Sequence, residues 1–264
     1  MAGSTSSNAA FTDRTMVVSG GSRGIGLAIA LGAARHGANV VLLAKTAEPH
    51  PKLPGTVHTA VAEVEAAGGK GVAVVGDVRN EDDVVRAVDT AVERFGGIDI
   101  VVNNASAIAT EPTENLTAKK FDLMMDINVR GTFLLTKAAL PHLRAAGGNI
   151  VNVSSIAGVE GEVYSAGYCA AKHGLVGLTR ALAIEFTKDR LRVNAICPGG
   201  MPTAQTTEFQ APENADWDLI MRIASPRGFM DTADVAKTIA FLASDDAAAI
   251  HGAVYRVDNG KGAG

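Results

Sequence analysis

Short apolar runs rich in β-branched residues alternate along the chain with longer, helix-like stretches. Most of the short runs are continuously apolar, which is typical of strands that are covered on both faces. They predict strands at residues 16–19, 39–43, 71–75, 98–102, 149–153, 192–196 and 253–257. The longer stretches predict helices at residues 24–36, 57–67, 81–95, 117–145, 167–188 and 232–243.

The order of these elements predicts an α/β fold. Repeated strand–helix–strand units with glycine at the strand ends build a doubly wound parallel sheet, here of about seven strands with helices on both faces. No linker splits the chain into separate units. We therefore expect one domain at residues 13–264, preceded by a disordered Ser/Ala/Asn-rich tail at residues 1–12.

Two segments break this pattern. Residues 45–56, with the sequence KTAEPHPKLPGT, cannot continue a helix because of their three prolines, and predict a rigid loop after the second strand. Residues 199–223 carry Pro202, Pro212 and the only tryptophan, Trp217, and predict a mobile substrate loop. Ligands bind at loops that follow the carboxyl ends of parallel strands. The alternative for either segment is a surface insertion without a role.

Composition and charge exclude several classes of function. The net charge is −4 without a long basic run, which argues against nucleic acid or an anionic membrane as the main partner. The two cysteines, Cys169 and Cys197, lie outside any CxxC or Cys/His cluster and indicate reduced thiols in a cytoplasmic protein. The six histidines are scattered without a metal-binding spacing, so we expect no metal site.

No membrane or export signal is visible in the sequence. The tail at residues 1–12 lacks the basic start and the apolar core of a signal peptide. No apolar stretch reaches the roughly 18 residues that a membrane span needs. We expect a cytoplasmic protein.

The segment SGGSRGIG, residues 19–26, follows the first predicted strand and opens the first predicted helix. Gly20, Gly24 and Gly26 let the chain turn sharply and let backbone N–H groups reach a pyrophosphate at the helix N-terminus. The spacing is GxxxGxG, and its position at the first strand–helix junction indicates dinucleotide binding. The alternative is a turn that only packs the helix on the strand.

The end of the second predicted strand bears on the choice of dinucleotide. An acidic residue at this place commonly binds the ribose 2′-hydroxyl of NAD. Here the strand ends with Ala44 and Lys45, and Arg23 in the glycine-rich loop is a second cation aimed at the same region. Two cations without a carboxylate fit a 2′-phosphate, so we favour NADP(H) over NAD(H). The alternative is that both cations are merely solvated.

Tyr168 and Lys172 stand four residues apart in GYCAAKHG, with small residues between them. Side chains at this spacing share one face of a helix. A lysine charge near a phenol favours the phenolate and lowers the pKa of the tyrosine, so the pair can act as an acid/base. Taken alone, YxxxK fits a surface tyrosine and a solvated lysine equally well.

Several ordered motifs over residues 15–258 resemble those of the short-chain dehydrogenase/reductase family. The glycine-rich loop is similar to TGxxxGIG, and GDV at residues 76–78 resembles the strand end where an aspartate meets the adenine. NNAS at residues 103–106 resembles NNAG, and NVRG at residues 128–131 resembles the motif of the active-site asparagine. NVSSIAG, YCAAK and CPGGMPT resemble the motifs of the serine, of the tyrosine with its lysine, and of PGxxxT. The resemblance implies a single-domain Rossmann fold.

The resemblance assigns catalytic roles to Asn128, Ser155, Tyr168 and Lys172. Ser155 is selected over Ser154 because it directly precedes an xxG turn and lies thirteen residues before the tyrosine. Together with the glycine-rich loop and the second strand, the resemblance predicts cofactor contacts at Gly20, Ser22, Arg23, Gly24, Ile25, Gly26, Lys45, Asp77, Val78, Asn104, Tyr168, Lys172, Pro198, Gly199 and Thr203.

The family's chemistry implies an oxidoreductase that transfers a hydride between NADP(H) and a small carbonyl or secondary alcohol. Tyr168 would carry the proton, Lys172 would lower its pKa and bind the nicotinamide ribose, and Ser155 would polarise the substrate oxygen. Asn128 would hold a water that links Lys172 to solvent. The alternatives are an NAD-linked alcohol dehydrogenase of the same family and a dinucleotide-binding sensor or scaffold without catalysis. For single residues, Ser155 could be a turn serine and Asn128 a helix cap.

The proline-rich loop further resembles the hydroxysteroid dehydrogenase-like subgroup, and the chain ends soon after the last predicted strand, so we expect no appended sterol-carrier domain. Two positions depart from the family pattern: Ser106 replaces a glycine, and VDNGKGAG replaces the usual VDGG-like end. Family members are often tetramers built through their two long helices, here residues 117–145 and 167–188, and we expect the same homotetramer.

Overall fold

The computed structural model describes residues 10–50, 54–202, 211–212, 214–222 and 224–263. Their strands form one parallel sheet in the order β3-β2-β1-β4-β5-β6-β7, which confirms the predicted doubly wound single-domain fold. The strands are β1 Thr15–Ser19, β2 Asn39–Ala44, β3 Lys70–Val75, β4 Ile100–Asn103, β5 Asn149–Val153, β6 Arg192–Pro198 and β7 Val254–Val257.

Helices cover both faces of the sheet, which explains why the strands are continuously apolar. In β1, Met16 and Val18 pack in the cluster on one face, whereas Val17 between them packs on the other. Successive side chains of a strand point to opposite faces, so a strand buried on both sides needs an apolar residue at every position. The same alternation holds for Leu42 and Leu43 in β2.

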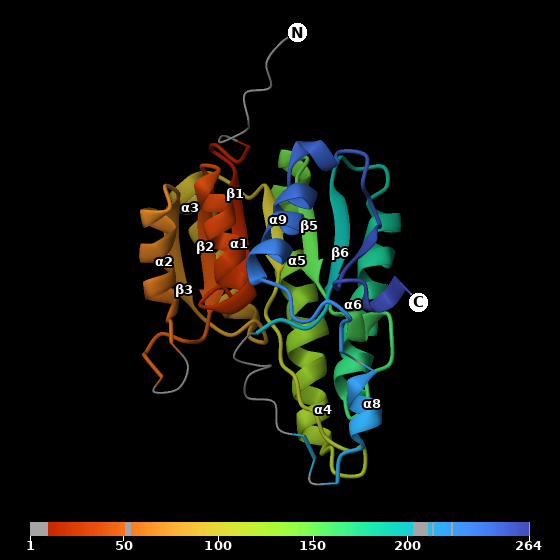
Figure 1. Ribbon diagram of the computed structural model, residues 1–264. Helices are drawn as coiled ribbons and strands as arrows, with labels where there is room; N and C mark the ends of the chain where they lie inside the picture. The colour runs from red at the N-terminus through yellow and green to blue at the C-terminus, as the bar shows by residue number, and fades with distance from the viewer. Residues whose placement is uncertain (1–9, 51–53, 203–210, 213, 223, 264) are drawn as a thin grey trace.

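Figure 1 shows α1 and α9 on the near face of the sheet, with α4 and α8 extending past the carboxyl ends of the strands. The near layer packs through α1, α2 and α9, and the far layer through α3, α5 and α6. The helices are α1 Gly24–Arg35, α2 Val57–Ala66, α3 Glu81–Phe95, α4 Ala118–Met125, α5 Thr132–Ala146, α6 Ala166–Glu185, α8 Trp217–Met221 and α9 Thr232–Ala243. Short 3₁₀ turns lie at Ile156–Gly158, Asp245–Ala247 and Lys261–Ala263.

The predicted helix at 117–145 is not a uniform α-helix. A π-helical segment, Asp126–Gly131, separates α4 from α5. Gly131 closes this segment, and a β-carbon there would lie 2.8 Å from a methyl group of Val78. A π-turn widens the backbone locally and re-aims its side chains, and it occurs often at functional sites. Apolar spacing alone does not predict such a turn, so the sequence placed Asn128 on a straight helix.

Several other predicted boundaries differ from the structure by one to three residues. β4 begins at Ile100 rather than at Ile98, which is buried in the core but precedes the strand. Helix α6 ends at Glu185 rather than at Lys188. Boundaries shift in this way because burial of a side chain does not require regular backbone pairing.

Residues 10–12, which we expected to belong to the tail, pack against the fold. Phe11, which the sequence placed in the tail, is 2% exposed, and its backbone N–H donates to the His36 carbonyl at 3.0 Å. Its ring meets the His36 ring edge-on at 6.1 Å between centroids. Burial of this aromatic side chain, together with the backbone hydrogen bond to His36, holds residues 10–12 against the fold. Residues 1–9 lie outside the described part of the chain.

Within the described residues, none of the helices combines the length and the apolarity that crossing a bilayer would require.

Candidate active site

The carboxyl ends of the parallel strands all meet at one edge of the sheet, and the predicted site residues gather there. A pocket of about 340 Å³ opens at this edge, and Ser155, Tyr168, Pro198 and Gly199 contribute to its wall. Ile25, from the first turn of α1, lines the same pocket. The topology therefore brings together motifs from β1, β5, α6 and β6 that are far apart in the sequence.

The glycine-rich loop needs its glycines for two different reasons. Gly20 and Gly24 have φ angles of +70° and +56°, in the left-handed region that favours glycine. Gly26 allows close packing, since a β-carbon there would lie 2.3 Å from the Gly20 carbonyl oxygen. A β-carbon on Gly24 would meet nothing within 4 Å, so the loop is open on that side.

The N-terminus of α1 has no side-chain cap. Arg23 occupies the N-cap position and makes no capping hydrogen bond. The first N–H groups of a helix need an acceptor, and an anion can supply it together with the favourable helix dipole. The uncapped end and the open side of Gly24 together fit a phosphate group.

Asn104 holds the glycine-rich loop in place. Its side-chain amide donates to the carbonyls of Ser19 and Gly20 at 3.0 and 3.2 Å, and its backbone N–H donates to the Ser19 hydroxyl at 3.0 Å. Ser22 in the same loop is buried. Asn104 was predicted as a cofactor contact, and the described contacts of its amide are with the loop.

Charged residues gather where β2 and β3 end. The Arg79 guanidinium binds the Asp77 carboxylate through two nitrogens, at 2.6 Å in the shortest contact, and the Lys45 ammonium lies 3.6 Å from the same carboxylate. The hydrogen bond from Arg79 lowers the pKa of Asp77 to about 2. The Asp83 carboxylate, paired with Arg86, accepts from the Asp77 N–H at 2.9 Å, so this corner carries charges of both signs. Arg79 was not predicted, although it stands two residues after Asp77.

The Arg23 side chain is only partly satisfied. One terminal nitrogen, Nη2, donates to the Thr46 hydroxyl at 3.0 Å. The other, Nη1, is buried and has no hydrogen-bond partner among the described residues. A buried guanidinium nitrogen without an acceptor is costly, and an anionic ligand would satisfy it.

The proline-rich loop packs over the glycine-rich loop. A β-carbon on Gly55 would lie 2.9 Å from the Ser22 carbonyl oxygen, so the two loops touch. Thr56 then starts α2 with a capping box, in which its hydroxyl accepts from the Thr59 N–H at 3.1 Å. The described ends of residues 45–56 are thus part of this corner of the site, while residues 51–53 lie outside the description.

Tyr168 and Lys172 lie on one face of α6, as the spacing predicts, and both are buried. The Tyr168 hydroxyl makes hydrogen bonds with the side chains of Ser155 and Ser106. The Lys172 ammonium lies 5.6 Å from the centre of the Tyr168 ring and donates to the Val153 carbonyl at 3.0 Å.

The electrostatic expectation for this pair does not hold in the protein alone. Burial raises the pKa of Tyr168 to about 12, against the hydrogen bonds that lower it, and the Glu162 charge raises it further. Burial also lowers the pKa of Lys172 to about 7, so its ammonium loses much of its charge near neutral pH. Desolvation therefore outweighs the charge that we expected to lower the pKa of the phenol.

Asn128 is fully buried in the π-helical segment, and its side chain is completely engaged. Its amide nitrogen donates to the Ala107 and Met124 carbonyls, each at 2.8 Å. Its side-chain oxygen accepts from the Ser106 hydroxyl at 2.8 Å. Its backbone carbonyl accepts from the Thr132 hydroxyl at 3.0 Å.

A family model described as enoyl-(acyl carrier protein) reductase matches residues 20–261. The chain belongs to the short-chain dehydrogenase/reductase family. This family of oxidoreductases also accounts for the sheet order and for the motifs at its carboxyl edge.

Curated relatives support the predicted subgroup. Hydroxysteroid dehydrogenase-like protein 2 of Danio rerio is 49% identical over 187 residues, which are 70% of this chain and 45% of that protein. The human protein of the same name is 47% identical over 188 residues, 70% of this chain and 44% of the other. The chain thus matches less than half of the length of these relatives.

Solved structures of the family share the fold over almost the whole chain. A short-chain dehydrogenase from Mycobacterium paratuberculosis, solved with NAD, is 32% identical with a TM-score of 0.88 and covers 96% of this chain and 98% of its own. Levodione reductase is 34% identical, with a TM-score of 0.85 and coverage of 96% and 99%. A putative dehydrogenase from Xanthomonas campestris is 39% identical, with a TM-score of 0.81 and coverage of 93% and 88%.

The remaining predicted residues divide into three cases. Pro198 and Gly199 end β6 in the pocket wall. Val78 is buried below the edge of the sheet, in the far core cluster. Thr203 lies outside the described residues, as do residues 204–210, 213 and 223 of the predicted substrate loop.

Glu162 is a site residue that no sequence motif singled out, although we expected the segment at 158–165 to contact the substrate. It lines the pocket that Tyr168 also lines, and burial raises the pKa of its carboxyl group, against the lowering effect of Lys261. It lies in the loop before α6, where nothing in its sequence context distinguishes it from a solvated surface acid. Only the fold distinguishes Glu162, because it places this residue beside Tyr168.

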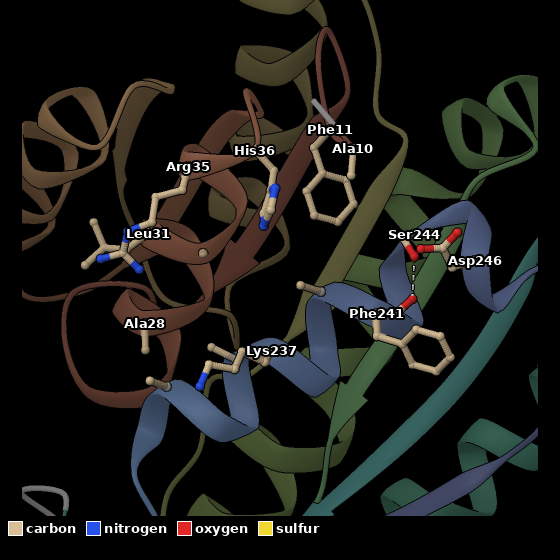
Figure 2. A pocket seen from close by; sticks show the side chains of 14 residues that line it. Ala10, Phe11, Ala28, Leu31, Arg35, His36, Lys237, Phe241, Ser244 and Asp246 are labelled. Atoms are coloured by element: carbon tan, nitrogen blue, oxygen red, sulfur yellow. Dashed lines mark hydrogen bonds between the residues drawn. The ribbon is translucent and has the colours of Figure 1, made fainter. Parts of the chain in front are cut away.

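A second pocket, of about 540 Å³, lies between α1, α9 and the turn at Ala10 and Phe11 (Figure 2). It is larger than the first but contains none of the predicted catalytic or cofactor-binding residues. Figure 2 shows the Ser244 hydroxyl in its wall, which donates to the Phe241 carbonyl at 2.8 Å. The candidate active site is therefore the smaller pocket at the carboxyl edge.

Proposed function

We propose that the protein transfers a hydride between NADP(H) and a small carbonyl or secondary alcohol, with Tyr168 as the general acid/base. The observation that carries the proposal is the buried Tyr168 hydroxyl, which lines the pocket in hydrogen-bond contact with Ser155. Membership of the family and the dehydrogenases and reductases among the solved relatives support it.

The residues present fit a nicotinamide dinucleotide. The uncapped α1 terminus and the open side of Gly24 would take its pyrophosphate, and Ile25, Pro198 and Gly199 would flank the ring near Tyr168. When bound, the cofactor supplies the hydride donor or acceptor.

Tyr168 is protonated at neutral pH, because its pKa is about 12 in the protein alone. It can therefore donate a proton to a carbonyl oxygen that becomes an alcohol, and the reverse reaction requires it to accept one. Ser155, held by the Ala157 N–H that donates to its hydroxyl oxygen at 3.2 Å, would orient the substrate oxygen. In this scheme a phenolate at Tyr168 would favour the ammonium form of Lys172, which then compensates the phenolate charge.

Asn128 would act as a support of the site rather than through its own side chain. Its amide is bound to Ala107 and Met124, and its side-chain oxygen to Ser106. A water that links Lys172 to solvent would have to use its backbone carbonyl, which already accepts from Thr132 and has a second lone pair.

The charge pattern supports NADP(H). Arg23, Lys45 and Arg79 lie at the corner where the adenosine ribose would bind, and Asp77, the acid among them, is held by Arg79. The buried Nη1 of Arg23 lacks an acceptor among the described residues, which a 2′-phosphate would provide. NAD(H) is the second candidate, because one solved relative was crystallised with NAD.

The pocket favours an apolar substrate. Its wall includes Ile108, Ile220, Met221 and Phe229, with Glu162 as its charged member among the described residues. A small ketone or secondary alcohol with an apolar body would bury this surface.

The test is a fluorescence titration of the purified protein with NADPH and NADH, repeated with Lys45→Asp. We expect NADPH to bind at least about tenfold more tightly than NADH, and the substitution to remove that preference. Lys70→Asp is the matched control, because Lys70 begins β3 at the opposite edge of the sheet. Equal or tighter NADH binding would overturn the 2′-phosphate assignment, and binding of neither would favour a scaffold.

A panel of apolar ketones then tests the chemistry. An enoyl thioester belongs in the panel, since the matching family model carries that description. Tyr168→Phe should lower turnover by roughly 10²- to 10⁴-fold, the usual range for loss of a general acid. Retained turnover in this variant would refute the role of Tyr168.

A further inference from the structure

We propose that Ser106 is a positioning residue for Tyr168: its hydroxyl joins the phenol to Asn128 and stabilises the phenolate once the proton has left. The inference rests on the proposed role of Tyr168 and deepens it. The family pattern has a glycine at this position, so this hydroxyl is an addition to the usual site.

Ser106 is held in place by the loop that follows β4. The preceding Asn104 is bound to the glycine-rich loop, and the Ala105 N–H donates to the Ser19 hydroxyl at 3.1 Å. Two residues beyond Asn104, the Ser106 hydroxyl lies 2.8 Å from the side-chain oxygen of Asn128. After the serine, the Ala107 carbonyl accepts from the Asn128 amide at 2.8 Å, so the backbone is held on both sides of Ser106.

The orientation of Asn128 determines what Ser106 can do. Both N–H groups of the Asn128 amide are donated, to Ala107 and Met124, so its oxygen faces Ser106 and can only accept. The Ser106 proton points to that oxygen while Tyr168 is protonated. The lone pairs of the Ser106 oxygen can then accept a hydrogen bond from the Tyr168 hydroxyl.

Loss of the Tyr168 proton changes this arrangement without moving any other proton between residues. The phenol O–H bond breaks and its proton goes to the substrate oxygen, which forms the new O–H bond of the alcohol. The Ser106 O–H then rotates from Asn128 to the phenolate and keeps its own proton. A hydrogen bond to a charged acceptor is stronger than one between neutral groups, so Ser106 favours the phenolate.

Among the described residues, the titratable groups that face Tyr168 are Glu162 from the preceding loop, and Cys169 and Lys172 from α6. From α4, Met124 packs in the same cluster and does not titrate. Replacement of Ser106 by alanine or glycine leaves all of these charges unchanged. A change in the pKa of Tyr168 in these variants would therefore measure the effect of the Ser106 hydroxyl.

The experiment uses ¹⁹F NMR of protein that carries 3-fluorotyrosine, whose phenol is more acidic and titrates in a range where proteins stay folded. The chain has three tyrosines, and Tyr168→Phe assigns the signal of the site. Tyr255 in β7 serves as an internal reference. This readout needs neither turnover nor substrate.

We expect Ser106→Ala and Ser106→Gly to raise the pKa of fluorinated Tyr168 by about one unit, as loss of a hydrogen bond to a charged group requires. The pH profile of alcohol oxidation should shift upward equally. Ser165→Ala is the matched control, because the Ser165 hydroxyl donates to the Val163 carbonyl instead.

An unchanged or lowered pKa of Tyr168 in both Ser106 variants would overturn the inference. The proposed function fails separately, by retained turnover in Tyr168→Phe, and that result leaves the ¹⁹F titration readable. Ser106→Ala keeps the β-carbon, so agreement of the two variants excludes an effect of backbone freedom at glycine.

Discussion

Tyr168 and Lys172 show that two residues can be placed correctly while their electrostatics are misjudged. Their spacing of four residues predicted that they share one face of a helix, and α6 confirms this. Their burial raises the pKa of Tyr168 to about 12 and lowers that of Lys172 to about 7. Desolvation acts against the charged form of each group, and it depends on the whole surrounding fold rather than on the neighbour four residues away.

Glu162 gives a prediction at the same scale. Its pKa is raised by burial, so between its ordinary value of 4.5 and the raised one the folded state binds more protons than the unfolded state. Stability is therefore lost as pH rises through that window. Glu162→Gln should raise the melting temperature above the window, by about 2–4 °C for each 1 kcal/mol removed, and the difference should shrink toward pH 4.5.

Thermal unfolding of both proteins at a series of pH values measures this effect. Glu63→Gln, at an exposed position of α2, controls for the loss of one negative charge. A difference between Glu162→Gln and the parent that stays constant with pH would show that burial does not govern this carboxyl group.

At the scale of single elements, α1 illustrates two kinds of glycine in one helix. Gly26 lies against the backbone of the glycine-rich loop, with 2.3 Å between an added β-carbon and the Gly20 carbonyl oxygen. Gly32, two turns later, has nothing within 4 Å of an added β-carbon. The first glycine is required by packing, whereas the second only lowers helix propensity.

The two glycines predict opposite outcomes for the same change. Gly26→Ala should destabilise the protein by about 1–3 kcal/mol through overpacking and weaken dinucleotide binding. Gly32→Ala should stabilise it by about 0.5–1 kcal/mol. Urea unfolding followed by circular dichroism measures both, and equal effects of the two substitutions would contradict the packing argument.

At the scale of the whole molecule, the long helices present apolar side chains to the outside. Phe121 on α4, Phe133 on α5 and Ile184 on α6 are 38%, 45% and 78% exposed. We predict that these side chains are buried between the subunits of the expected homotetramer, in which the helices at 117–145 and 167–188 pack between subunits.

Light scattering tests this assembly. The wild-type mass should be four times the 27.1 kDa of one chain, and Phe133→Asp together with Ile184→Asp should lower it, because each would bury an unpaired charge. Val85→Asp on α3, where Val85 is 42% exposed, is the matched control and should leave the mass unchanged. A monomeric mass for the wild-type protein would refute the tetramer.

The sequence by itself determined the elements, their order in a doubly wound sheet and the motifs at its carboxyl edge. These properties follow from local chemistry: apolar runs at β1 and β2, the glycines at 20, 24 and 26, and the spacing of Tyr168 and Lys172. The family motifs extended this prediction to Ser155, which the structure brings to the same pocket as Tyr168.

Only the tertiary structure decided the π-turn at Asn128, the buried Glu162, the Arg79–Asp77 pair and the place of Ser106 between Tyr168 and Asn128. The physical reason is the same in each case. A pKa shift, an unpaired guanidinium or a hydrogen-bond chain depends on groups that meet from distant parts of the chain. No local sequence pattern encodes these contacts. They form only when the sheet and its helices pack together.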